Sequence, residues 1–237
     1  MSTSKKLLFL FFPLLLAFFS CQAKIDGVIR EGGSANLSIK AALGPRTIAL
    51  IRSLRFFTGE GDQKPILDGN TINHSLALAP GILSASLINT DAHSLEGPIA
   101  ISNVGDFLTV GDDKSRFISF QESRDSSSIV IALDKNSAPE LISMLSPEVG
   151  EYLSALMAPV MLGETMTKQE YLNLVTSIYG RLVSEEIASS RIRMAIELPK
   201  PVKTVLGGKF SKNLAEFDIP LLDILVMENP ISYQITW

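Results

Sequence analysis

Few side chains in this sequence have the types and spacings that enzyme catalysis requires. The chain contains one cysteine, Cys21, and two histidines, His74 and His93. Asp91 precedes His93 by two residues, but a nucleophilic triad also needs a hydroxyl held against the histidine ring, and no Gly-x-Ser-x-Gly elbow occurs. We therefore predict that His93 lies in a surface loop and that no residue of this chain is catalytic.

Acidic residues occur as adjacent pairs at Asp112–Asp113 and at Glu185–Glu186. Such pairs support acid–base chemistry when burial separates their pKa values. The first pair has the composition of a turn, and the second falls on the outward side of an expected helix, so we predict that both are solvated. One cysteine and two histidines cannot form a cysteine cluster or a multi-histidine site. We therefore expect neither a metal nor a cofactor.

The most distinctive apolar segment spans residues 144–166, which contain four of the seven methionines. Methionine is flexible and polarizable and suits adaptable binding surfaces. Two prolines and two glycines divide the segment into short helical pieces. The candidate contacts for a hydrophobic ligand or a protein partner are Met144, Leu153, Met157 and Met161. The alternative interpretation is a helical hairpin that packs its apolar face on a sheet.

The first twenty residues have the organisation of a secretory signal peptide. Lys5 and Lys6 form a basic start, and residues 7–19 form an apolar run. At about 1.5 Å per residue this run is too short to cross a hydrocarbon core of about 30 Å as a helix, and Pro13 interrupts it. We predict a signal peptide over residues 1–20 that is cleaved, rather than a membrane-spanning anchor.

The residues that end this leader, Phe18-Phe19-Ser20-Cys21, resemble the lipobox of bacterial lipoproteins, in which a small residue precedes the cysteine that becomes lipidated. The usual leucine and the usual alanine or serine before the small residue are both phenylalanine here, a loose form that is typical of spirochaete lipoproteins. The resemblance covers residues 5–21. It implies that Cys21 becomes the first residue and carries a thioether-linked diacylglycerol and an N-acyl chain such as palmitate. The alternative is an ordinary cleavage site with a cysteine nearby.

The charge balance favours an anchor that does not depend on basic residues. Removing Lys5 and Lys6 leaves 19 of the 21 basic residues against 25 acidic ones, a net charge of −6. Such a surface is repelled by anionic lipid headgroups and by nucleic acid. We therefore predict membrane lipid as a partner through Cys21, no nucleic acid as a partner, and a location in the cell envelope.

The elements expected along the chain predict an α+β fold with antiparallel sheet. A Gly-Gly pair within residues 31–34 separates two β-like segments, which predicts a hairpin. Neighbouring strands joined by short polar turns favour antiparallel pairing. Further strands are expected at 82–89, 97–102, 117–121, 128–133, 192–198, 214–218 and 231–237, helices at 45–57 and 71–79, and a loop at 203–212.

A helical segment is expected to be inserted around residues 138–188. Within it, Thr167 and Glu170 match a capping box and start a helix that we expect to continue to the end of the segment. We expect residues 21–237 to form one α+β domain, and a subdivision near residue 136 is the alternative. The order of strands and helices fits two ferredoxin-like subdomains, or one sheet to which both ends of the chain contribute.

Together these features predict a membrane-tethered envelope lipoprotein with a non-enzymatic binding or structural role. The lipobox-like cysteine, the short tether Gln22–Lys24 and the lack of catalytic groups favour this function, with a hydrophobic ligand or partner bound through residues 144–166. The alternative is an envelope hydrolase that uses His93 or a carboxylate pair. A cavity beneath the Met-rich segment would favour the first function, and titratable groups that converge in a pocket would favour the second.

Overall fold

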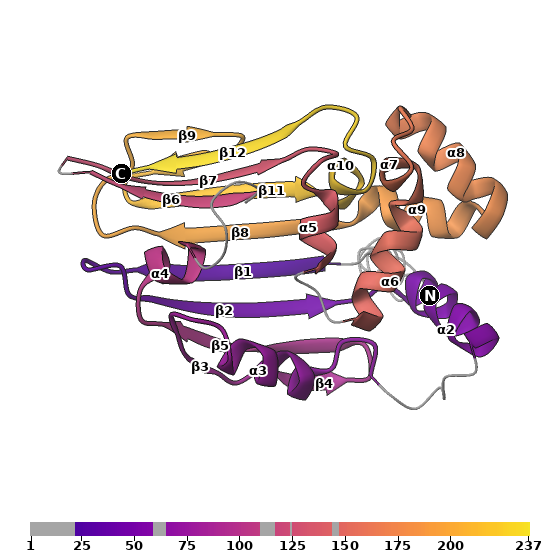
Figure 1. The fold of residues 1–237 in the computed structure, drawn as a ribbon, viewed down its shortest axis with the longest axis horizontal. Helices are drawn as coiled ribbons and strands as arrows, with labels where there is room; N and C mark the ends of the chain where they lie inside the picture. The colour runs from indigo at the N-terminus through magenta and orange to yellow at the C-terminus, as the bar shows by residue number, and fades with distance from the viewer. Residues whose placement is uncertain (1–21, 59–64, 110–116, 124, 144–146) are drawn as a thin grey trace, which may run out of the picture.

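The computed structural model describes residues 22–58, 65–109, 117–123, 125–143 and 147–237. Two β-sheets extend along the long axis of the molecule, and most of the helices gather at one end of them, at the right of Figure 1. Both sheets consist mainly of antiparallel strands, so the fold is of the α+β class that the sequence predicted.

The larger sheet contains eight of the described strands. These are β1 (Gln22–Ile29), β2 (Ala35–Ala42), β3 (Ile82–Ala85), β4 (Ile88–Asp91), β5 (Ser94–Ile101), β8 (Arg191–Glu197), β10 (Lys209–Ser211) and β11 (Leu214–Pro220). Their order is β10-β11-β8-β1-β2-β5-β3, and β4 also pairs with β5. Among these strands β1 and β8 pair in parallel, and the other described pairs are antiparallel.

The smaller sheet contains four of the described strands, all paired antiparallel. These are β6 (Ile118–Glu122), β7 (Ser127–Leu133), β9 (Thr204–Leu206) and β12 (Ile231–Thr236), in the order β6-β7-β12-β9. Each sheet therefore contains strands from both sides of residue 136. The sheet to which both ends of the chain contribute, one of the two arrangements expected from the sequence, is the one observed.

The predicted hairpin at the start of the chain is present as β1 and β2. Its turn uses Gly32 and Gly33, whose φ angles are +85° and +83°. Glycine adopts such angles without the steric cost that a Cβ atom would bring. The strands then pair in register up to the turn, where Ile29 faces Ala35 and both are buried. The glycine pair therefore closes the hairpin with its apolar residues on the core side.

The described helices cover the segments between the strands. They are α2 (Pro45–Thr58), α3 (Gly69–Ala77), α4 (Val104–Thr109), α5 (Ala138–Ser143), α6 (Pro147–Leu156), α7 (Ala158–Met161), α8 (Lys168–Tyr179), α9 (Arg181–Ser189) and α10 (Leu221–Val226). The prediction of one helix from Thr167 to the end of the inserted segment is wrong. Gly180, with φ of +89° and ψ of 160°, leaves the helical conformation and separates α8 from α9.

Three other boundaries differ from the sequence predictions. The strand expected at 82–89 is divided into β3 and β4, because Ser86 and Leu87 belong to neither strand and Leu87 exchanges hydrogen bonds with the Asn73 side chain of α3. Helix α3 (Gly69–Ala77) begins two residues earlier than expected, because the Asp68 carboxylate caps it by accepting a hydrogen bond from the Asn70 amide. The segment 203–212, expected as a loop, contains the short strands β9 and β10.

The main hydrophobic core lies between the two sheets and continues over α10. Phe217 of β11 and Tyr233 of β12 meet edge to face, with ring centroids 5.6 Å apart, and so join the two sheets. Leu225 of α10 is fully buried in the same cluster. The C-terminus is held in the smaller sheet, since Trp237 exchanges two backbone hydrogen bonds with Ser127.

The predicted capping box at the start of α8 is confirmed and provides a test of local stability. The Thr167 hydroxyl accepts from the Glu170 amide, and the Glu170 carboxylate accepts from the Thr167 amide, which lowers the pKa of Glu170. Replacing Thr167 with alanine should reduce the free energy of unfolding by about 1 kcal/mol. Urea unfolding measures this loss, and exposed Thr165→Ala serves as the control. Equal midpoints for the two variants would contradict the prediction.

Candidate ligand-binding cavity

The first described residue, Gln22, already belongs to β1. The candidate lipidation residue Cys21 and the leader 1–20 lie outside the described residues. The expected tether Gln22–Lys24 is instead the beginning of the strand, so this part of the prediction is corrected: no spacer separates residue 21 from the folded chain. None of the described helices is both long and apolar enough to cross a membrane.

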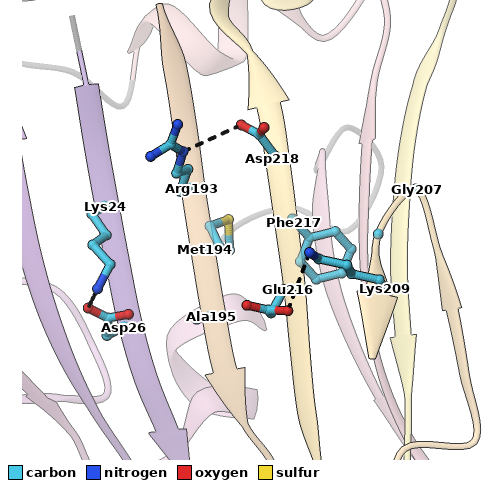
Figure 2. Close-up of a pocket in the computed structure, with 11 residues that line it drawn as sticks. Lys24, Asp26, Arg193, Met194, Ala195, Gly207, Lys209, Glu216, Phe217 and Asp218 are labelled. Carbon is cyan, nitrogen blue, oxygen red and sulfur yellow. Dashed lines mark hydrogen bonds and ion pairs between the residues drawn. The ribbon is translucent and has the colours of Figure 1, made fainter. Parts of the chain in front are cut away.

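A groove of about 600 Å³ lies on the polar face of the larger sheet (Figure 2). Its cations and carboxylates face one another rather than a common point. Three ion pairs lie in it: Lys24–Asp26 at 2.6 Å within β1, Arg193–Asp218 at 3.9 Å and Lys209–Glu216 at 3.8 Å. These charges balance within the groove, and exposed pairs of this kind contribute little to stability. The groove is therefore best described as the solvated face of the sheet.

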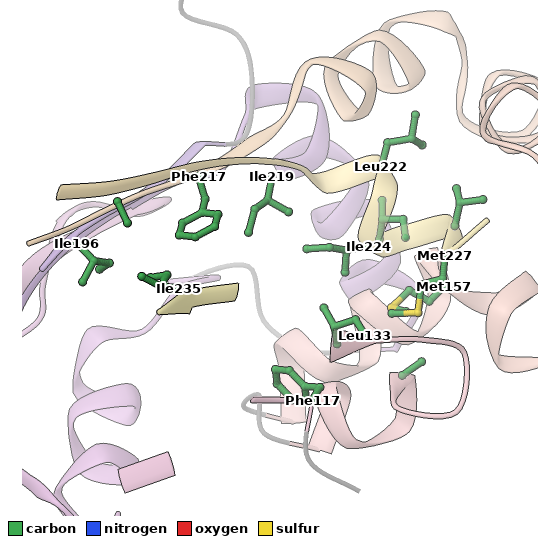
Figure 3. Packing of buried hydrophobic residues seen from close by; sticks show 14 of the residues in the cluster. Phe117, Leu133, Met157, Ile196, Phe217, Ile219, Leu222, Ile224, Met227 and Ile235 are labelled. Carbon is green, nitrogen blue, oxygen red and sulfur yellow. The ribbon is translucent and has the colours of Figure 1, made fainter. Parts of the chain in front are cut away.

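The four residues proposed as ligand contacts do not gather at one place. Met157 is 0 % exposed and lies in the main core, near Ile224 and Met227 (Figure 3). Met161 is 42 % exposed at the end of α7. Leu153 of α6 lines a cavity. Met144 lies outside the described residues.

The cavity that Leu153 lines has a volume of about 330 Å³, and we call it the helix-end cavity. It lies beneath α6, within the Met-rich segment, where the ends of β1, β2 and β8 approach the helices. Its apolar wall is formed by Ala23, Ala41, Ala42, Leu43, Ile51, Ile66, Leu67, Tyr152, Leu153, Leu156, Ile187, Ile192 and Leu221. Gln22, Thr47 and Arg191 are its polar lining residues.

Helical spacing and small side chains explain why this space exists. Leu153 and Leu156 lie three residues apart on α6 and therefore share one face of that helix. On the opposite wall, Ala23 of β1 pairs directly with Ala41 of β2. The methyl groups of these two alanines lie where larger aliphatic side chains would contact α6. The space between the strands and the helix therefore remains unfilled.

A hydrogen bond from the neighbouring helix holds this wall in place. The Tyr171 hydroxyl of α8 donates to the carbonyl oxygen of Leu156 at 2.9 Å. Burial raises the pKa of Tyr171, so the hydroxyl remains protonated and able to donate. The last turn of α6 is thereby fixed to α8, and the apolar face that carries Leu153 is presented to the cavity.

A second apolar cavity, of about 260 Å³, lies between the two sheets, and we call it the inter-sheet cavity. Ile25 and Leu37 of the larger sheet face it, as do Ile129 and Ile131 of the smaller one. All four side chains are only half-buried although they point inward. Its lining does not include residues of the segment 144–166, so it is separate from the helix-end cavity.

The residues around His93 do not form a catalytic triad. The Asp91 carboxylate accepts hydrogen bonds from the His93 backbone amide at 2.7 Å and from the Ser94 hydroxyl at 3.0 Å. These contacts, the amide first, lower the pKa of Asp91. The imidazole instead lies 3.4 Å from the Arg52 guanidinium. The Asp91 carboxylate binds the Ser94 hydroxyl and the His93 backbone. It therefore does not orient the His93 ring, and the Ser94 hydroxyl is not hydrogen-bonded to the imidazole as a triad requires.

The two acidic residues at 185 and 186 have opposite environments, and the prediction that both are solvated is wrong for one of them. Glu185 is exposed and pairs with Arg181 at 3.5 Å. Glu186 is only 4 % exposed and accepts hydrogen bonds from the amides of Arg46 and Thr47 at the start of α2. Its carboxylate therefore caps a helix that has no capping side chain of its own. The pair Asp112–Asp113 lies outside the described residues.

The described residues contain no group of three histidine, cysteine or acidic side chains that could hold a metal ion. The capping role of Glu186 has only a weak signal in the sequence. The helix start Gly44-Pro45 lacks a side-chain cap, which indicates that another residue provides one, but nothing in the sequence indicates which distant residue it is. The helix-end cavity likewise needs several distant chain segments to converge, and only Leu153 among its lining residues was predicted from the sequence to contact a ligand.

Comparisons with known proteins give one weak structural similarity. No family model matches the chain, and no curated protein matches it. The folded domain of the LppM protein of Mycobacterium tuberculosis, solved by NMR, is similar over 92% of this chain and 89% of that chain, with 10% sequence identity and a TM-score of 0.39. A TM-score below 0.5 does not establish a shared fold or a shared function.

Proposed function

We propose that this protein is an envelope lipoprotein, anchored by lipid at Cys21, with the non-enzymatic role of binding a hydrophobic ligand. The helix-end cavity is the observation that carries the proposal. It lies beneath the Met-rich segment, as a ligand-binding role of that segment requires, and the strand that borders it begins one residue after Cys21. Among the described groups considered for hydrolysis, the Glu186 carboxylate caps α2, and the Asp91 carboxylate binds the His93 backbone amide and the Ser94 hydroxyl rather than the imidazole.

The chemistry of the cavity wall selects an aliphatic ligand. Its lining consists largely of alanine, leucine and isoleucine side chains, which provide dispersion contacts and no hydrogen bonds. The cavity has three polar lining residues, Gln22, Arg191 and Thr47. Gln22 and Arg191 are paired with each other where β1 contacts β8. An acyl chain fits this distribution better than a compact polar metabolite, whose polar groups would be left without partners.

Acylation of Cys21 is tested by metabolic labelling with radioactive palmitate. The Cys21→Ser variant should lose all of the label, because the thioether cannot form and the leader is not processed at that residue. Ser20→Ala keeps a small residue before the cysteine and should label as the unchanged protein does. A Cys21→Ser variant that labels equally, or a mature protein that begins elsewhere, would contradict the anchor.

Ligand binding is tested on residues 22–237 produced in the cytoplasm, which contain every described element and carry no acyl group. Mass spectrometry of the purified protein should find an aliphatic lipid at about one equivalent. Leu153→Trp fills the helix-end cavity and should reduce the bound lipid at least about tenfold, whereas Leu162→Trp, at an exposed site near the end of α7, should not.

Two results would overturn this assignment. The first is a folded 22–237 protein, as judged by circular dichroism, that neither carries a lipid nor binds added palmitate. The second is lipid that is lost on Ile131→Trp, in the inter-sheet cavity, and retained on Leu153→Trp. That outcome would place the ligand between the sheets.

A further inference from the structure

We propose that the occupant of the helix-end cavity is an acyl chain of the protein's own anchor, carried on Cys21. This inference rests on the proposed function and identifies its ligand. It makes the anchor a group with two positions: inserted in the bilayer, or withdrawn into the protein.

Covalent geometry limits how far the anchor can start from the cavity. Gln22 lines the cavity and is the first described residue of β1, paired with Ala42 on one side and with Arg191 on the other. Consecutive Cα atoms are about 3.8 Å apart, so any group on Cys21 starts within one residue of the apolar wall. The strand begins without a spacer, and the attached chain therefore has no linker that would carry it away from this opening.

Tethering favours this chain over a free lipid. A ligand attached through a short linker has an effective concentration on the order of millimolar, well above that of a free fatty acid in water. The attached chain also has no carboxylate. A free fatty acid would bring a charged head group to the rim, where Arg191 is the cationic lining residue. The same apolar wall would accept both, so the source of the chain must be tested directly.

The size of the cavity limits how much of the anchor it can hold. A volume of about 330 Å³ corresponds to roughly eleven groups of the size of a water molecule. It therefore holds most of one acyl chain and not two. A single chain gives only marginal and reversible membrane binding, and two give stable attachment. Withdrawal of one chain should thus loosen the hold on the membrane without releasing it.

Photo-crosslinking in the lipidated full-length protein tests this inference. Cells are grown with a palmitate analogue that carries a diazirine near its end, so that the probe enters the anchor at Cys21. After purification and irradiation, peptides are analysed by mass spectrometry. We expect a crosslink that joins the N-terminal peptide to peptides from the cavity wall, around Leu153 or Ile51.

Matched variants test whether the crosslink depends on the cavity. Leu153→Trp should abolish it, and Leu162→Trp, at an exposed site, should retain it. If Leu153→Trp fails to fold by circular dichroism, Ala41→Leu narrows the same cavity from the opposite wall. When the cavity is filled, all acyl chains of the anchor should insert in the bilayer. The lipidated variant is then held more firmly, and its transfer between phosphatidylcholine vesicles should become about tenfold slower.

The outcomes separate this inference from the proposed function. Cavity peptides that carry a free lipid, unconnected to Cys21, would overturn the inference and leave the ligand-binding function intact. A labelled Cys21 peptide that crosslinks only to membrane lipid would overturn the inference as well. Absence of label at Cys21 would contradict the lipid anchor itself, and with it the proposed function.

Discussion

Replacing Glu186 with alanine is expected to reduce the free energy of unfolding by about 3 kcal/mol. The carboxylate accepts three hydrogen bonds from the start of α2: from the Arg46 amide at 3.1 Å, and from the amide and hydroxyl of Thr47 at 2.7 Å each. Thr47 is buried, so its amide could not turn to water once the acceptor is removed. The negative charge also lies at the positive end of the α2 dipole.

The neighbouring residue provides the matched control. Glu185→Ala removes the same charge from the same helix, but the side chain is 57 % exposed, and its pair with Arg181 is of a kind that contributes less than about 1 kcal/mol. Urea unfolding of both variants measures the difference. Glu186→Gln keeps one acceptor oxygen and should fall between them. Equal midpoints for Glu185→Ala and Glu186→Ala would show that the buried carboxylate does not hold α2.

Replacing Gly97 with alanine is the second change with a large expected effect, a loss of about 3 kcal/mol. Gly97 lies in β5, opposite Ser86 and Leu87, the two residues between β3 and β4. A Cβ atom at residue 97 would collide with the Ser86 carbonyl oxygen and lie 2.9 Å from the Leu87 Cα atom. These are backbone atoms held in place by hydrogen bonds, from the Ser86 amide to the Pro98 carbonyl oxygen and between Leu87 and the Asn73 side chain, so they cannot move away as a flexible side chain would.

The control for Gly97→Ala is Gly32→Ala in the first hairpin. That residue has a positive φ of +85°, but no heavy atom lies within 4 Å of the position a Cβ would take. Only the backbone penalty remains there, about 1 kcal/mol. Thermal unfolding followed by circular dichroism should show a clearly larger loss for Gly97→Ala. An equal or smaller loss would mean that Ser86 and Leu87 can shift at little cost.

Elements with strong local signals could be predicted from the sequence. The hairpin of β1 and β2 follows from a Gly-Gly turn between alternating segments, and α8 begins at its capping box, because both signals act within a few residues. Even so, local patterns led to an error at Gly180, where the apolar spacing continues across a break. The helical period on either side is intact, and only the conformation of one glycine separates the two helices.

Pairings between distant segments could not be predicted. The parallel contact of β1 with β8 joins Gln22 to Arg191, and nothing in either segment specifies the other. The same holds for Glu185 and Glu186, which are identical in type and adjacent in the chain. One is exposed and the other buried because α9 turns a single face toward α2, and that face is set by packing.

The sequence alone determined the expected cellular location of this protein and its local elements. A leader, a small residue before Cys21, a turn and a helix cap each depend on a few adjacent residues. The tertiary structure decided the cavity. Ala23, Ala41 and Leu153 come from separate elements, and the space among them exists only when those elements converge. Short-range steric and hydrogen-bonding preferences act within one segment, whereas a cavity of this kind forms only where several segments pack together.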